Sequence, residues 1–167
     1  ETEQLMDIFE KLSSGQRMTT RQAEERLAGG DLLRLAGLAK ARRQDLHPDN
    51  VSTFQIDRNI NYTNICECRC RFCAFFREAD APDAYLLAKE QVLERVEEAV
   101  RLGATQVMLQ GGLHPDLGIE YFEELFRAIK QRFDVSIHSL SPPEVQHLSR
   151  KSGLELQPLL QRLRAAG

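Results

Sequence analysis

Residues 66–73 read Cys66-Glu67-Cys68-Arg69-Cys70-Arg71-Phe72-Cys73, and they hold all four cysteines of the chain. Cysteines used as small buried hydrophobes would be scattered along the sequence. Four thiols within eight residues indicate instead that they meet at one point. The rest of the sequence is best understood from what surrounds that point.

Three kinds of chemistry use grouped cysteines. A disulfide needs a Cα separation and a dihedral angle that cysteines this close in sequence rarely reach. Structural zinc usually takes two ligand pairs joined by a longer loop, or cysteines with a spaced histidine, and the nearest histidines are His47 and His114. Iron–sulfur clusters take cysteine thiolates as their standard ligands. We therefore favour an iron–sulfur cluster and keep zinc as the alternative.

Within this group, Cys66, Cys70 and Cys73 have the spacing C-x3-C-x2-C. Three thiolate ligands on a four-iron cube leave one iron open for a substrate or a cofactor. Cys68 is then the extra cysteine, and we interpret it as a loop residue outside the ligand set.

The cysteines follow a predicted strand, and the same order recurs along the chain. Strands are predicted over about 53–64, 106–110 and 135–139, and helices over about 89–102, 119–133, 141–153 and 156–166. Strand, loop and helix in this order, three times, predict a parallel sheet covered by helices. In (β/α) barrels the active site lies on the loops after the strands. We therefore expect the cysteines, the Gly111-Gly112 turn and the serine-rich turn near Ser141 to cluster in space.

The first 52 residues have a different character. Leu5, Ile8, Phe9 and Leu12 have helical spacing. Thr19 and Gln22 make a capping box for a second helix that ends at the Gly29-Gly30 pair. A third helix is predicted to end before His47-Pro48. We interpret residues 1–52 as a helical extension packed on the domain that residues 53–167 form.

Composition excludes several classes of protein. The net charge of −3 carries no basic excess that would indicate nucleic acid as a partner. No apolar run approaches the roughly 18 residues that indicate a membrane span. The amino-terminal residues are acidic and amphipathic, unlike a signal peptide. Free cysteines without an export signal predict a cytoplasmic protein.

Several stretches carry a resemblance to a known family. Residues 58–66 read RNINYTNIC and residues 70–77 read CRFCAFFR, which resembles the menaquinone and deazaflavin branch of the radical S-adenosylmethionine (SAM) superfamily. Within that branch, DAYLL at 83–87, QGGLHPD at 110–116, EYFEELF at 120–126 and SLSPPE at 139–144 most resemble the dehypoxanthine futalosine cyclases, also called cyclic dehypoxanthine futalosine synthases. The resemblance is dense from residue 53 to residue 166.

The resemblance implies an α/β fold, a partial (β/α)6 barrel of the TIM type. It implies that Cys66, Cys70 and Cys73 hold a [4Fe-4S] cluster whose open iron binds SAM. In the family, reductive cleavage of SAM gives a 5′-deoxyadenosyl radical, which takes hydrogen from C4′ of the ribose of dehypoxanthine futalosine and so leads to the cyclic product of menaquinone biosynthesis. A low-potential electron donor such as flavodoxin or ferredoxin is implied as a partner.

The resemblance also assigns contacts to SAM. Gly111 and Gly112 match the family's Gly-Gly motif, which receives the amino group of SAM, although a turn that needs positive φ would also explain them. Phe72 packs near the adenine in the family, and a core aromatic is the alternative. Ser141 completes the predicted cofactor contacts.

Catalytic residues are less well defined, and His114 and Glu144 are the candidates. His114 lies in an ordinary Leu-His-Pro-Asp loop. The run Ser141-Pro-Pro-Glu144 is also a capping box, which explains its serine and glutamate without a ligand. Tyr62 and Asn64 lie at the end of the first predicted strand and are expected to face either the cavity or the core. His138 and His147 are interpreted as structural residues.

Three strands make only half of a six-stranded barrel, so we expect this chain to be the amino-terminal half of such an enzyme. We expect the half-barrel to hold a cluster but to turn over poorly, and its third strand to be an unpaired apolar edge. A sibling enzyme, such as aminofutalosine synthase or half of the deazaflavin (FO) synthase, is the nearest alternative. A non-catalytic zinc- or cluster-binding module is the alternative from another class.

Overall fold

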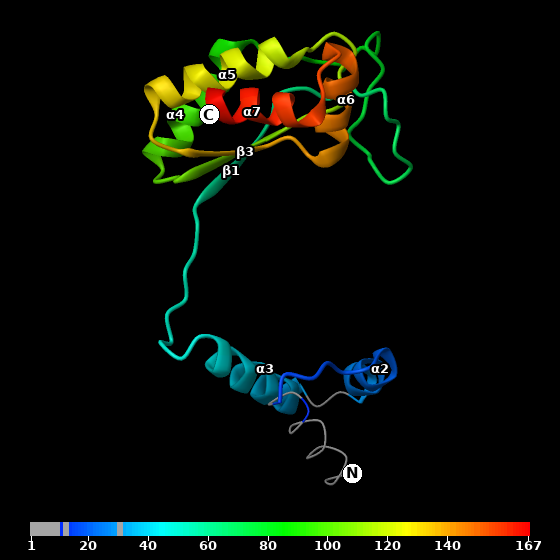
Figure 1. The fold of residues 1–167 in the computed structure, drawn as a ribbon, viewed down its shortest axis with the longest axis vertical. Coiled ribbons are helices and arrows are strands. Elements are labelled where there is room, and N and C mark those ends of the chain that lie inside the picture. Colours follow the sequence, from blue (N-terminus) through cyan, green and yellow to red (C-terminus); the bar gives the residue numbers. More distant parts are fainter. Residues whose placement is uncertain (1–10, 12–13, 30–31) are drawn as a thin grey trace. The chain divides into compact units, whose positions relative to one another are not determined.

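A computed structural model describes residue 11 and residues 14–29 and 32–167, and Figure 1 shows the chain as a ribbon. The chain forms two compact units, Glu1–Thr53 and Phe54–Gly167. No helix within the described ranges is long and apolar enough to cross a membrane. The helix predicted around Leu5 to Leu12 lies outside the described residues.

The first unit contains helices α2 (Thr20–Ala28) and α3 (Leu32–Leu46). The predicted capping box is confirmed, because the Gln22 amide donates to Thr19 Oγ1 at 3.2 Å and the Thr19 amide donates to Gln22 Oε1 at 3.0 Å. Neither helix contains a buried residue. The apolar side chains of this unit therefore do not form a core among the described residues.

The second unit alternates strands and helices along its length. Its elements are β1 (Asp57–Asn61), α4 (Lys89–Arg101), β2 (Gln106–Gln110), α5 (Ile119–Arg132), β3 (Ser136–Ser139), α6 (Pro142–Ser152) and α7 (Leu156–Ala166). The strands are parallel in the order β1-β2-β3. The predicted α/β fold with a parallel sheet is confirmed.

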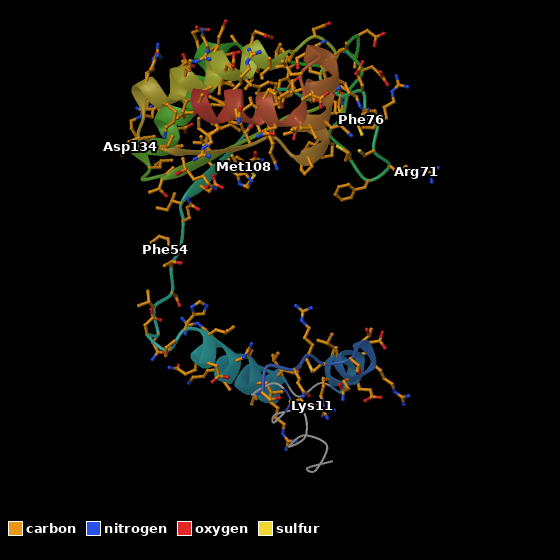
Figure 2. All side chains as sticks on the ribbon, in the orientation of Figure 1. Lys11, Phe54, Arg71, Phe76, Met108 and Asp134 are labelled. Carbon is orange, nitrogen blue, oxygen red and sulfur yellow. The ribbon has the colours of Figure 1, made fainter. Side chains whose placement is uncertain are left out.

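The first strand is shorter than predicted. It begins at Asp57, which pairs with Gln106, the first residue of β2. Phe54 therefore has no partner strand beside it and is 88% exposed on the segment that precedes β1 (Figure 2). β-type alternation over about 53–64 suggested a longer strand, but pairing with β2 decides where the strand starts.

The core lies between the sheet and helices α4, α5 and α7, which Figure 1 shows on one side of the strands. Burying each large apolar side chain is worth about 1.5–3 kcal/mol. The strands contribute Ile60, Val107 and Leu109, and the helices contribute Val92, Val96, Phe122, Leu125, Ile129, Leu159 and Leu163.

The opposite face of the sheet is polar. Side chains alternate along a strand, so Asn59, Met108 and His138 lie on the face away from the buried Val107 and Leu109, and register places these three side by side. Figure 2 shows Met108 on the side away from the helices. In a closed barrel this face would line the interior.

Candidate functional site

The cysteine loop, defined as residues 66–77, begins shortly after β1 and returns to its own start. The Cys66 amide donates to the carbonyl of Arg77 at 3.2 Å, and the Arg77 amide donates to the carbonyl of Asn64 at 2.8 Å. Figure 2 shows Arg71 and Phe76 on this loop. The loop is therefore fixed at both ends and leaves the carboxyl end of β1, as predicted.

The four thiols differ in exposure. Cys66 and Cys73 are half-buried, whereas Cys68 and Cys70 are exposed. The backbone amide of Leu113, beyond the end of β2, donates to Cys66 Sγ at 3.3 Å. Cys68 Sγ lies 3.3 Å from Cys70 Sγ, and this contact raises the pKa of Cys68.

The donor chemistry of this loop fits a [4Fe-4S] cluster. Thiolates are the standard ligands, and the Leu113 N–H already points at one of them, as amides that stabilise sulfur ligands do. Within the described part of the chain, no three His, Cys, Asp or Glu side chains are gathered closely enough to hold a metal ion. Cys70 and Cys73 would therefore have to turn towards Cys66 when iron binds. A cavity of about 280 Å³ adjoins Cys66.

The Gly111-Gly112 turn packs directly against the residues that lead into the cysteine loop. A Cβ on Gly111 would lie 2.2 Å from Tyr62 Cζ, and one on Gly112 would lie 2.3 Å from the carbonyl oxygen of Ile65 and 2.5 Å from Cys66 Cβ. Neither glycine has positive φ. The alternative explanation by a positive-φ turn is thus wrong, because close approach is what excludes a side chain here.

His114 follows the Gly-Gly turn and is buried. Its Nδ1 accepts from the Asp116 amide at 3.0 Å, so the neutral ring carries its proton on Nε2. Burial lowers the pKa of His114, against the opposing charge of Asp116. His147 of α6 donates from Nε2 to the carbonyl of His114 at 3.2 Å. His147 therefore joins α6 to the loop that follows β2.

The serine-rich turn begins α6. Glu144 Oε2 accepts from the Ser141 amide at 2.7 Å and from Ser141 Oγ at 2.5 Å. The Ser141 hydroxyl is thus already occupied by the cap, and one oxygen of Glu144 is too. The other oxygen, Oε1, is buried and has no hydrogen-bond partner among the described residues.

The remaining predicted residues lie in different surroundings. Phe72 is 98% exposed, so the alternative that it is a core aromatic is wrong. Tyr62 is fully buried beneath the Gly-Gly turn. Asn64 bonds the backbone of Asp83 and Tyr85, which closes the segment after the cysteine loop. His138 is exposed on the polar face of the sheet.

Sequence reasoning missed two parts of this region. The Leu113 amide contacts Cys66 across 47 residues, and no pattern in the sequence marks a backbone donor. The polar face with Asn59 and Gln110 was also missed. Its signal was present in β2, where Gln106, Met108 and Gln110 alternate with the buried Val107 and Leu109.

This chain is similar to known proteins over most of its length. A model of the "Radical SAM superfamily" matches residues 60–164. The cyclic dehypoxanthine futalosine synthase of Halalkalibacterium halodurans is 35% identical over 161 residues, which is 96% of this chain and 44% of that protein. The 5-amino-6-(D-ribitylamino)uracil–L-tyrosine 4-hydroxyphenyl transferase of Methanopyrus kandleri is 48% identical over 116 residues, 69% of this chain and 31% of that protein. The chain thus spans less than half the length of these relatives.

Among solved structures, the X-ray structure of the FeFe-hydrogenase maturase HydG from Carboxydothermus hydrogenoformans is similar in fold. Its TM-score is 0.60 at 20% sequence identity, over 99% of this chain and 46% of that one. At this identity the likeness shows the fold alone. It agrees with a parallel sheet that forms part of a TIM-type barrel.

Proposed function

Because the chain belongs to the radical SAM superfamily, whose members use a [4Fe-4S] cluster and SAM, we propose that Cys66, Cys70 and Cys73 are the cluster ligands. The observation that carries this proposal is the contact between the cysteine loop and the Gly-Gly turn. Leu113 donates to Cys66, and Gly112 leaves no room for a side chain against the same cysteine.

The bound cofactors would supply one-electron cleavage of SAM and the carbon radical that abstracts hydrogen from a substrate. The chain would supply binding groups, and the complete barrel would exclude water from the site. Three thiolates would hold iron, and the Leu113 amide would donate its hydrogen bond to the sulfur of Cys66. Backbone groups of Gly111 and Gly112 would receive the amino group of SAM. A low-potential donor such as flavodoxin or ferredoxin would supply the electron.

We further propose that the complete enzyme cyclises dehypoxanthine futalosine in menaquinone biosynthesis. Similarity to a cyclic dehypoxanthine futalosine synthase over 96% of this chain supports this proposal. The polar sheet face, with Asn59 and His138, offers hydrogen-bonding groups of the kind that a ribose-containing substrate requires. Residues 53–167 would form the first three βα units of its barrel, with residues 1–52 as a helical extension.

A second candidate is an enzyme of the deazaflavin branch. The transferase relative is 48% identical, a higher value than that of the cyclase relative, although over a shorter segment. Both relatives match the segment with the cysteine loop and the Gly-Gly turn, so the choice between them lies in the substrate.

Anaerobic reconstitution with iron and sulfide tests the cofactor proposal. The complete polypeptide is expected to bind about four irons per chain, to turn brown, and to give an EPR signal that changes when SAM is added. The Cys66→Ser variant is the matched control and should not assemble the cluster. One zinc per chain with no iron would contradict the proposal.

Substrate assays test the choice of reaction. The reconstituted complete polypeptide, SAM and a reductant are incubated either with dehypoxanthine futalosine or with 5-amino-6-(D-ribitylamino)uracil and L-tyrosine. We expect the cyclic product from the first incubation only. Product from the second incubation alone would replace the cyclase with the second candidate.

A further inference from the structure

The two exposed thiols of the cysteine loop are in contact with each other. Cys68 Sγ lies 3.3 Å from Cys70 Sγ, and both cysteines are free. Cys66 and Cys73, by contrast, are half-buried, and the sulfur of Cys66 already accepts from the Leu113 amide. An oxidant in solution therefore reaches Cys68 and Cys70 most easily, and each of them has the other as a neighbouring thiol.

The backbone between the two cysteines explains how they meet. Cysteines this close in sequence rarely have the geometry of a disulfide. However, Arg69 has a φ of 50°, in the left-handed region that few residues other than glycine adopt. A left-handed residue turns the chain sharply and brings the side chains before and after it together. The Arg69 guanidinium also pairs with the Glu78 carboxylate at 2.8 Å, which ties this turn to the segment beyond the loop.

The two cysteines differ in their relation to the cluster. Cys70 belongs to the proposed ligand set, whereas Cys68 does not. Iron in the site would occupy the sulfur of Cys70, so the two thiols can react with each other only when the site is empty. Oxidation of a lone exposed thiol passes from sulfenic acid, which is reversible, to sulfinic and sulfonic acids, which thiols do not reduce. A neighbouring thiol instead converts the sulfenic acid into a reducible disulfide.

We propose that Cys68 is a resolving cysteine: in the cluster-free protein it closes a reversible disulfide with Cys70 and so protects this ligand from irreversible oxidation. Hydrogen peroxide oxidises one of the two thiols to sulfenic acid and releases water. The second sulfur then attacks the sulfenic sulfur, the S–O bond breaks, and a second water leaves. Two thiols and one peroxide thus give one disulfide and two waters. The inference rests on the proposed function only for the role of Cys70 as an iron ligand.

Peptide mapping of the cluster-free complete polypeptide tests the disulfide. The protein is treated with hydrogen peroxide, its free thiols are alkylated, and it is digested with trypsin. Trypsin cleaves after arginine, so it separates Cys68, Cys70 and Cys73 onto three peptides, residues 59–69, 70–71 and 72–77. We expect the first peptide to be joined to the second.

Two variants identify the cysteine that forms this link. Cys66 lies on the same peptide as Cys68, so Cys66→Ser is the matched control and should keep the link. Cys68→Ser should abolish it. A link between peptides 70–71 and 72–77 in place of the expected one, or no link at all, would overturn the proposal.

A second test measures the protection of Cys70. The cluster-free protein is exposed to hydrogen peroxide, reduced with dithiothreitol, and examined by mass spectrometry and by iron uptake. The unchanged protein should return Cys70 as a thiol and then bind about four irons per chain. Cys68→Ser should carry sulfinic or sulfonic acid at Cys70 and lose most of its iron uptake, although without peroxide it should bind iron almost as well as the unchanged protein. Equal oxidation of Cys70 in both proteins would refute the protection.

The resolving role and the proposed function fail in different ways. If the untreated, unchanged protein binds zinc and no iron, the proposed function is wrong, and the peptide map still shows whether Cys68 pairs with Cys70. If that protein assembles a full cluster but peroxide does not join peptides 59–69 and 70–71, the proposed function stands and the resolving role is wrong.

Discussion

At the scale of single residues, the region near the cysteines depends on close contacts that are possible only where there is no side chain. Gly112 lies against Cys66 so closely that even a methyl group is excluded. The Leu113 amide then reaches Cys66 Sγ. These two contacts connect two of the predicted loops, and each gives a prediction that a single substitution can test.

The ligand set is tested by replacing each cysteine with serine. Cys66→Ser, Cys70→Ser and Cys73→Ser should each lose most of the iron after anaerobic reconstitution, because a three-thiolate site has no spare ligand. Cys68→Ser should keep at least about three of the expected four irons, measured by iron and sulfide analysis. The thiol of Cys68 lies only 3.3 Å from that of Cys70, close enough to compete as a ligand. Loss of iron in Cys68→Ser would therefore contradict the proposed ligand set and show that Cys68 is a ligand.

Gly112→Ala tests the close approach. The new Cβ would lie 2.3 Å from the Ile65 carbonyl oxygen, which is backbone and cannot rotate away. We expect a loss of about 1–3 kcal/mol in the free energy of unfolding, measured by chemical denaturation, together with reduced iron loading. Gly37→Ala is the control. A Cβ added at Gly37 would have no other atom within 4 Å, and alanine favours a helix, so this variant should not lose stability.

At the scale of elements, the helices are tied together by charge as well as by apolar packing. Arg162 of α7 donates to both carboxylate oxygens of Glu123 of α5, from Nε at 2.8 Å and from Nη2 at 2.9 Å. Glu123 is buried, and its hydrogen bonds with Arg162 lower its pKa. Two parallel hydrogen bonds of this kind fix the relative orientation of the two helices.

Glu123→Gln should lower the thermal midpoint by about 2–4 °C at neutral pH, the shift that accompanies a loss of about 1 kcal/mol in a protein of this size. The pKa of Glu123 is lower in the folded state than in the unfolded state, where it is about 4.3. The ionised carboxylate therefore contributes its full share to the free energy of unfolding at pH values above about 4.3. This contribution is lost as the pH falls through the lower folded pKa. The difference between Glu123→Gln and the unchanged protein should therefore shrink on acidification. A difference that stays constant from pH 7 to strongly acidic pH would contradict this role.

At the scale of the whole molecule, three βα units present a helix-covered face and a polar face. A barrel of the TIM type would enclose the polar face, whereas in this chain His138 of β3 is exposed there. Substrate chemistry with a reactive radical needs a site that excludes water. The uncovered face cannot meet that requirement by itself.

Residues 1–167 alone are therefore expected to bind a cluster. They are expected to form product at a rate at least about 100-fold below that of the complete polypeptide, because a substrate misplaced in an open site reacts more slowly by a factor of this order. The measurement compares iron content and product formation under the same anaerobic conditions. Product formation by residues 1–167 at the rate of the complete polypeptide would refute the expectation.

Much of the fold was predictable because two signals in the sequence agree: the spacing of apolar residues, and the positions of glycine and proline between the elements. The helix predicted over about 89–102 is observed at Lys89–Arg101, and the strand at Gln106–Gln110 was predicted with its observed bounds. The start of β1 was not predictable, because it depends on where β2 begins. The site was predictable as a set of loops after strands. The contact between Leu113 and Cys66 was not, because backbone amides leave no trace in composition.

The separation in sequence between Cys66 and the amide that donates to it also determines when this contact can form during protein synthesis. Leu113 lies 47 residues after Cys66, so during synthesis the ribosome must release β2 before that thiol acquires its backbone partner. Chains emerge at about 5–20 residues per second, which leaves the cysteines without this contact for several seconds. Iron insertion in the cell should accordingly follow translation of residue 113, and delivery of iron to a shorter nascent chain would meet thiols that are not yet arranged.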